Sequence, residues 1–174
     1  NTNAAISMAS GEYIVLADHD DIVPANALFE CAKALNEGKQ TGKNIDVIYS
    51  DEDKVDMKGK KYFEPHFKSD YNIDLLCSMN YICHLFVVKS SLVEELKKRD
   101  GAVLRREYDG AQDHDFILRC CELAENVYHI PKILYHWRSH ENSTAGNPDS
   151  KQYAIDAGKR ALEEHYARLG IDAE

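Results

Sequence analysis

Residues 13–21, YIVLADHDD, decide how this chain folds. The first five residues form a continuous apolar run, which Ser10 and Gly11 introduce and acidic residues end. A run of this length and composition is typical of a strand that is buried on both faces of a sheet. The sequence therefore predicts a buried strand over residues 13–17, with the polar residues 18–21 at its carboxyl end.

Strand and helix patterns alternate along the rest of the chain. Runs of apolar residues predict further strands over residues 47–49, 62–63, 85–88, 127–130 and 133–137. A short helix is expected over residues 73–78. Apolar stripes predict longer helices around Leu28, Cys31 and Leu35; around Leu92, Val93 and Leu96; around Phe116, Ile117, Cys120, Cys121 and Ala124; and around Ile155, Leu162, Tyr166 and Leu169, the last ending at Gly170. This alternation is typical of an α/β layered domain.

The length and charge of the chain limit what it can do. Its 174 residues suffice for one domain with a core, which we assign to residues 1–174. The net charge of −9 argues against a nucleic-acid-binding surface, which needs clustered Lys and Arg. The same charge suits a site where a divalent cation neutralises phosphates, although solubility alone also explains it.

The five cysteines and the N-terminal residues indicate the cellular compartment in which the protein works. The cysteines include no C-x-x-C pair, so they indicate small buried side chains in a reducing cytoplasm, neither a disulfide framework nor a zinc site. No apolar run approaches the roughly 18 residues that span a bilayer, and the N-terminal residues lack a signal-peptide pattern. The chain does not begin with Met, so we expect a fragment of a longer protein.

The acidic cluster Asp18, His19, Asp20 and Asp21 follows the first predicted strand. Ligands of open α/β sheets bind beyond the carboxyl ends of strands. Two carboxylates one residue apart can share a hard cation and leave positions for phosphate oxygens. The competing interpretation is a solvated, acidic helix N-terminus.

A second polar cluster, residues 110–115, opens the helix that Phe116 continues. A helix N-terminus favours an ionised carboxylate, which would keep Asp113 available as a proton acceptor. Asp113 and Asp115 point about 200° apart on an ideal helix. We therefore expect one of them to face a cleft and the other to cap the helix or face solvent.

A third cluster follows the last predicted strand, at residues 135–144. A neutral histidine there, His136 or His140, could complete a metal shell. The planar guanidinium of Arg138 suits a diphosphate. Alternation along the strand would send His136 and Arg138 to the same side. The competing interpretation is that the aromatic residues belong to the core and the polar ones to an ordinary loop.

Taken in this order, the clusters resemble family 2 glycosyltransferases, in particular the bacterial branch that builds O-antigens and rhamnans. The resemblance is carried by residues 9–21, 49–54, 80–85, 110–115 and 135–138. It implies a GT-A-like fold, a mixed sheet flanked by helices, of which this chain would be the C-terminal portion. The half that binds the nucleotide base would precede Asn1, so we expect the chain alone to bind the donor weakly and to be inactive.

The resemblance also implies roles for particular residues. Asp18 and Asp20 match the D-x-D motif that binds Mg²⁺ or Mn²⁺ on a nucleotide-diphosphate sugar. Asp113 matches the catalytic base, although Gln112 replaces the glutamate that usually precedes it. The segment from Arg138 to Ser143 matches a loop that closes on the diphosphate. One of the two histidines His136 and His140 would complete the metal shell. Contacts to sugars are expected from Asp51, Glu52, Trp137 and Tyr81.

The implied reaction is an inverting transfer to a hydroxyl group of a saccharide or a lipid-linked saccharide, in the synthesis of a cell-surface polysaccharide. The base removes the proton of that hydroxyl group, and the cation stabilises the departing nucleoside diphosphate. The resemblance implies a cytoplasmic protein that associates peripherally with the inner face of the cell membrane. No nucleic acid is expected as a partner.

Other functions compete with this interpretation. The repeated triplet of Asp18 to Asp20 and Asp113 to Asp115 could build the paired-metal site of a phosphohydrolase. A nucleotidyltransferase on a related fold would need the same base-binding half. A non-catalytic sugar-binding module is favoured if the Asp113 carboxylate is buried and fully paired.

Overall fold

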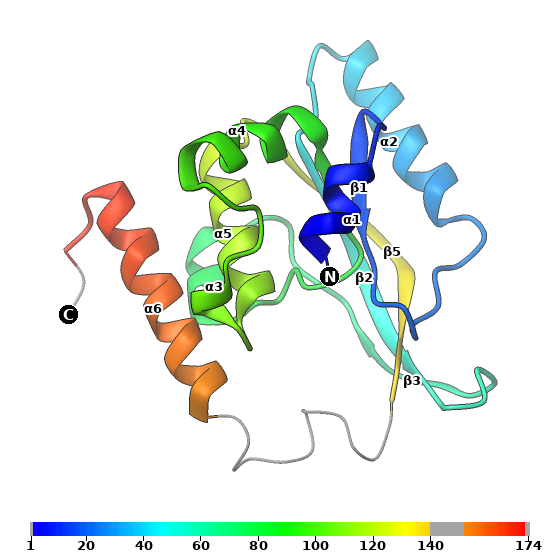
Figure 1. The fold of residues 1–174 in the computed structure, drawn as a ribbon. Coiled ribbons are helices and arrows are strands. Elements are labelled where there is room, and N and C mark those ends of the chain that lie inside the picture. The colour runs from blue at the N-terminus through cyan, green and yellow to red at the C-terminus, as the bar shows by residue number, and fades with distance from the viewer. Residues whose placement is uncertain (1, 140–151, 173–174) are drawn as a thin grey trace.

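A computed structural model describes residues 2–139 and 152–172 of the chain. Figure 1 shows a mixed sheet with helices on both of its faces. The helices are α1 (Thr2–Met8), α2 (Ala27–Gln40), α3 (Ile73–Ser78), α4 (Ser90–Asp100), η1 (Arg106–Tyr108, a 3₁₀ turn), α5 (Gln112–Leu123) and α6 (Gln152–Leu169). The strands are β1 (Tyr13–Leu16), β2 (Val47–Val55), β3 (Tyr62–His66), β4 (Phe86–Lys89) and β5 (Val127–Arg138). The expected α/β, GT-A-like class is confirmed.

Strand β2 is the centre of the five-stranded sheet. Its first residues pair antiparallel with β4, which pairs antiparallel with β1. Its last residues pair antiparallel with β3, across a hairpin that turns at Gly59. Strand β5 runs parallel to β2 along its whole length, so it must lie on the opposite side of β2 from β3 and β4. The sheet is therefore mixed, as predicted.

Alternate residues of the strands face two separate cores. Val47, Tyr49 and Phe86 face the core that α4 and α5 cover, whereas Ile48 and Val87 face the core under α2. This division follows from the period of two along a strand. Figure 1 shows α2 on one side of the sheet and α3, α4 and α5 on the other, with α6 packed on α5. Helix α5 is thus enclosed between the sheet and α6, and its residues 115–121 are all buried.

Two predictions about strands are wrong in detail. Strand β1 is not buried on both faces: Val15 is 36% exposed, because β1 stands at one end of the strand order and pairs with β4 alone in the described chain. The two strands predicted around Pro131 are one strand, β5. The register with β2 shifts between Ile130 and Ile133, so Pro131 lies in a bulge where no ladder hydrogen bond needs its missing N–H group.

The predicted apolar stripes of two helices are correct only in part: Cys31, Leu35 and Leu162 pack on the core, but other members do not. Helix α2 buries Ala27, Cys31 and Ala34, whereas Leu28 is 64% exposed. Helix α6 buries small residues and His165 in place of Ile155 and Leu169. In both helices the small side chains face the protein, which lets the helix backbone approach its neighbours closely. None of the described helices is both long and apolar enough to cross a membrane.

Candidate functional site

The acidic loop after β1 is held against the end of β5. The backbone N–H of Asp18 donates to the hydroxyl of Tyr135 at 2.9 Å, and this hydroxyl donates to the Asp21 carboxylate at 2.5 Å. The same carboxylate accepts the backbone N–H of Arg138 at 2.7 Å. Burial, and then the bond to Asp21, raise the pKa of Tyr135, so its hydroxyl stays a donor. Asp21 is therefore a structural brace for the loop.

Arg138 fixes the same loop from a second side. Its Nε donates to the carbonyl oxygen of Asp20 at 2.5 Å, and its Nη1 donates to the carbonyl oxygen of Met57 at 2.8 Å. The guanidinium therefore links the acidic loop to the β2–β3 turn. Its contact with a diphosphate stays a prediction, and Ser143, which was expected beside it, lies outside the described residues.

The other two carboxylates of the loop, those of Asp18 and Asp20, are partly exposed to solvent. The side chains of Asp18 and Asp20 are 62% and 32% exposed. Within residues 2–139 and 152–172, no three His, Cys, Asp or Glu side chains are grouped so as to hold a metal ion. Mg²⁺ commonly binds one or two carboxylates and takes its other ligands from substrate phosphates and water. Two carboxylates on a fixed loop fit that mode of binding.

The structure describes one of the two candidate histidine ligands. Nδ1 of His136 lies 2.5 Å from the Asp53 carboxylate, and its ring meets the ring of Tyr62 edge-on at 4.6 Å. Metal-binding histidines commonly donate their second ring N–H to a carboxylate in this way, which would leave Nε2 of His136 as the ligand atom. His140 lies outside the described residues.

Asp113 opens α5 and lines a cavity of about 370 Å³ together with Asp18. Within the described part of the chain no group hydrogen bonds to its carboxylate. Burial raises the pKa of Asp113, the nearby charge of Asp18 raises it further, and His84 opposes both. The cleft-facing carboxylate expected of this helix is therefore Asp113. It is not the fully paired group that would favour a non-catalytic module.

His84 belongs to this site but was given no role in the sequence analysis. Its Nε2 lies 3.7 Å from a carboxylate oxygen of Asp18, and its ring stacks on Tyr135 at a centroid distance of 4.8 Å. Its Nδ1 is buried and has no partner among the described residues. The residue stands just before the apolar run of β4, where no periodic signal marks a histidine. Only its place in the segment 80–85 could have drawn attention to it.

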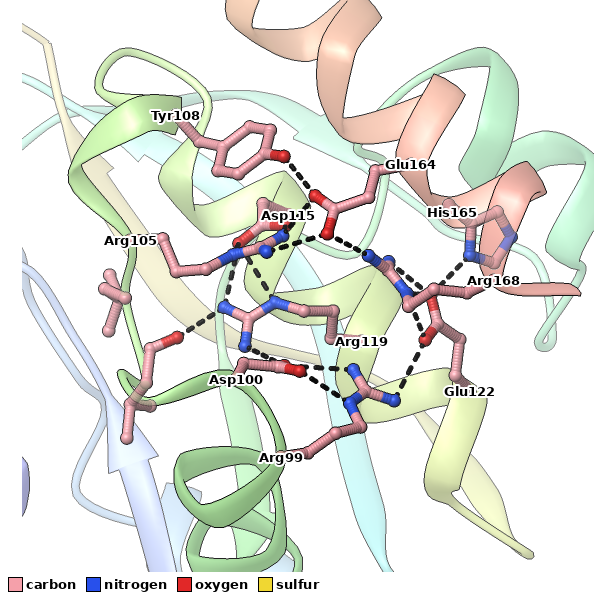
Figure 2. A network of polar contacts seen from close by, with 12 residues as sticks. Arg99, Asp100, Arg105, Tyr108, Asp115, Arg119, Glu122, Glu164, His165 and Arg168 are labelled. Carbon is pink, nitrogen blue, oxygen red and sulfur yellow. Dashed lines mark hydrogen bonds and ion pairs between the residues drawn. The ribbon is translucent and has the colours of Figure 1, made fainter.

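Asp115 neither caps α5 nor faces solvent, contrary to the prediction. It is fully buried and accepts hydrogen bonds from Arg105 at 2.5 Å and from Arg119 at 2.8 Å. Figure 2 shows how these arginines continue into a wider network. Arg105 also binds Glu164 of α6 at 2.8 Å, and Arg119 binds Asp100 of α4 at 2.9 Å. Helices α4, α5 and α6 are therefore joined by a network of charges whose centre, Asp115 and Arg119, is fully buried.

The second triplet does not build a paired-metal site. Nε2 of His114 lies 2.8 Å from the carbonyl oxygen of Leu76, which can only accept, so this nitrogen carries the proton. Burial lowers the pKa of His114, which keeps the ring neutral. With Asp115 in the arginine network, only Asp113 of the triplet faces the cavity. The arrangement disfavours the phosphohydrolase.

The predicted sugar contacts lie in different surroundings. Tyr81 is 2% exposed and packs edge-on against Tyr49 in the core, so that prediction is wrong: no ring face is left for a sugar. Asp51 is 3% exposed and accepts from Lys68 and His129, a structural role within β2. Glu52 is mostly buried and paired with Lys68. Trp137 is 38% exposed and keeps an accessible face, so its contact stays a prediction.

Comparisons with known proteins show which proteins the chain is similar to. The family model for glycosyl transferase family 2 matches residues 1–97, more than half of the chain. An uncharacterised protein of Sinorhizobium fredii, y4gI, is 43% identical over 96% of the chain, and the O-antigen biosynthesis protein RfbC of Myxococcus xanthus is 35% identical over 99%. The chain spans only 18% and 13% of these two relatives.

Solved structures show the same fold. The crystal structure of Staphylococcus aureus TarS residues 1–349 in complex with UDP-GlcNAc matches 99% of the chain and 47% of that structure, with a TM-score of 0.66 and 19% identity. A second crystal structure of S. aureus TarS, whose description gives no residue range, matches with a TM-score of 0.64 and 18% identity. The match covers 27% of that chain. At this level of identity the likeness concerns the fold.

Proposed function

The chain belongs to the family 2 glycosyltransferases, and from this premise we propose that it forms part of the catalytic site of an inverting, metal-dependent enzyme. This enzyme moves a sugar from a nucleotide-diphosphate donor to a hydroxyl group of a saccharide acceptor. The observation that carries the proposal is that Asp18, from the loop after β1, and Asp113, from the start of α5, line one cavity.

Asp113 acts as the base. Its carboxylate faces the cavity and is not bound by any described group, so it can accept a proton from an acceptor hydroxyl group. Its raised pKa makes it a stronger base than an exposed aspartate. At neutral pH it must still be ionised, and a cation beside Asp18 would favour that ionised form.

Asp18 and Asp20 would hold Mg²⁺ or Mn²⁺, which would supply positive charge to the departing nucleoside diphosphate. Asp21, Tyr135 and Arg138 fix the backbone of the loop that carries the two carboxylates, which reduces the reorganisation needed to bind a cation. His136, oriented by Asp53, or His140 would supply a further ligand.

The wider role follows from the relatives. RfbC is named for O-antigen biosynthesis, and TarS is solved with UDP-GlcNAc. We therefore propose a nucleotide-diphosphate sugar as donor and a saccharide or lipid-linked saccharide as acceptor, in the synthesis of a cell-surface polysaccharide. The enzyme would work in the cytoplasm, in peripheral contact with the membrane.

The metal requirement tests the proposal. In the whole protein, transfer from a panel of nucleotide-diphosphate sugars should stop with EDTA and return with Mn²⁺ or Mg²⁺. Asp18→Asn should raise the Mn²⁺ concentration needed for half-maximal rate by about tenfold or more, because one of two carboxylate ligands is lost. Asp172→Asn, an exposed aspartate away from the cavity, is the control. Transfer that persists unchanged in EDTA would refute the metal-dependent mechanism.

A further inference from the structure

The wall of the cavity beyond Asp113 contains two kinds of polar group. The first kind is already bound within the protein. The side chain of Asn3 pairs with both backbone groups of Leu104, at 2.7 and 2.9 Å. Arg105 is held by Asp115 and Glu164. These contacts hold the wall in place. Because Asp115 and Glu164 neutralise Arg105, its charge is not available to a ligand.

The second kind is available to a ligand. Arg106 and Asp109 line the cavity with exposed side chains, and no described residue hydrogen bonds to either side chain. Gln112 uses its carbonyl oxygen to accept the N–H of Gly110 at 2.7 Å, which leaves its NH₂ group to donate. These three residues line the same cavity as Asp113, and Gln112 directly precedes Asp113 in the sequence. The cavity of the proposed base therefore offers both hydrogen-bond donors and an acceptor.

The charges in the cavity select among polar ligands. With Arg105 neutralised by its partners, the remaining lining charges are Asp18, Asp109 and Asp113 against Arg106. A cation would offset Asp18, so the part of the cavity near the base stays negative. A second carboxylate brought there by a ligand would meet both Asp109 and Asp113, and like charges close together are costly.

We infer that this wall is the acceptor subsite, and that it selects a neutral saccharide over an acidic one through Asp109, Arg106 and Gln112. The inference rests on the proposed function. A cavity of about 370 Å³ falls in the range typical of small-ligand sites. A neutral sugar offers hydroxyl groups that both donate and accept, which matches the carboxylate of Asp109 and the N–H groups of Arg106 and Gln112. One further hydroxyl group of the sugar then lies at Asp113.

Acceptor kinetics of the whole protein test this inference. Methyl glycosides of neutral hexoses and the matched methyl uronides serve as acceptors, with a saturating nucleotide-diphosphate sugar. Asp109→Asn should raise the acceptor KM for the neutral glycosides by about tenfold, as the loss of a charged hydrogen-bonding partner would. It should also reduce the preference for neutral glycosides over uronides. The donor KM and the slow hydrolysis of the donor by water should not change.

A matched control separates the subsite from a general effect on its loop. Glu107 stands in the same segment, is exposed and does not line the cavity, so Glu107→Gln should leave the acceptor KM unchanged. The inference would be overturned if the acceptor KM of Asp109→Asn equalled that of the wild-type protein for every glycoside. It would also be overturned if the wild-type protein preferred uronides to neutral glycosides. Absence of both transfer and donor hydrolysis in the wild-type protein would instead overturn the proposed function.

Discussion

Asp113 and Asp115 stand two residues apart on α5 but lie in opposite environments. Asp113 faces the cavity, and no described group hydrogen bonds to its carboxylate. Asp115 is fully buried and is bound by Arg105 and Arg119. One face of the helix start therefore keeps a carboxylate whose charge is unfavourable in the free protein. The other face uses a carboxylate to hold three helices together.

The comparison explains how the site can stay open. A largely buried carboxylate without a partner costs free energy, which the rest of the fold must offset. Here Asp115 fixes the first turn of α5, and Arg105 extends that hold to the segment that forms the cavity wall. The buried network is thus the support of the site, and Asp113 is the group that it supports.

The largest expected effect is the loss of stability when Asp115 is neutralised. Asp115→Asn leaves Arg105 and Arg119 without their shared buried partner, and breaking a buried pair costs about 3–5 kcal/mol. Asp113→Asn should cost nothing, or stabilise slightly, because it removes an unfavourable charge. Urea unfolding followed by near-UV circular dichroism measures both variants. Equal losses in the free energy of unfolding of the two variants would contradict the structural role of Asp115 and the unpaired state of Asp113.

A smaller effect is expected at the outer end of the network. Glu164 binds Arg105, Tyr108 and Arg168, but its side chain is 37% exposed, so solvent screens these pairs. Glu164→Gln should therefore cost about 1 kcal/mol. Asp156→Asn, on the same helix, serves as the comparison for a charge change outside the network. If Glu164→Gln lost as much stability as Asp115→Asn, burial of the carboxylate would not determine how much its ion pairs stabilise the protein.

The contributions of Glu164 and Asp113 to the free energy of unfolding should depend on pH with opposite signs. Hydrogen bonds from Arg105 lower the pKa of Glu164 from 4.5 to about 2. Its contribution to stability is therefore complete above pH 4.5 and is lost as the pH falls toward 2. The pKa of Asp113 is raised by burial, so its effect reduces stability as the pH rises above 3.8. Unfolding of Asp113→Asn across this range should lack that second slope, and an unchanged slope would contradict the assignment.

The elements of the fold were largely predictable from the sequence. The helix over Ile73–Ser78 and the helix end at Gly170 follow from local pattern and from the left-handed backbone that glycine accepts. The path of β5 through Pro131 was not predictable, because it depends on pairing with β2. The buried faces of α2 and α6 were predicted only in part, because small residues occupy most of their fully buried positions.

The site was predictable only in part. The resemblance gave Asp18 and Asp113 roles in one site, whereas no local pattern joins residues so far apart. The role of Asp115 was missed because a charged residue in a first helical turn usually indicates capping or solvent. Its two arginines come from different segments, and only the folded chain brings them together. His84 was missed for the same reason, because its neighbours are distant in sequence.

The most direct test of the central claim is the turnover of Asp113→Asn in the whole protein. With the neutral acceptor saturating, kcat for transfer should fall by about 10²–10⁴-fold, as the loss of a general base would produce. The dissociation constant of the nucleotide-diphosphate sugar and the free energy of unfolding should stay near those of the wild-type protein. A variant that folds, binds the donor and retains the wild-type kcat would contradict the assignment of Asp113 as the base.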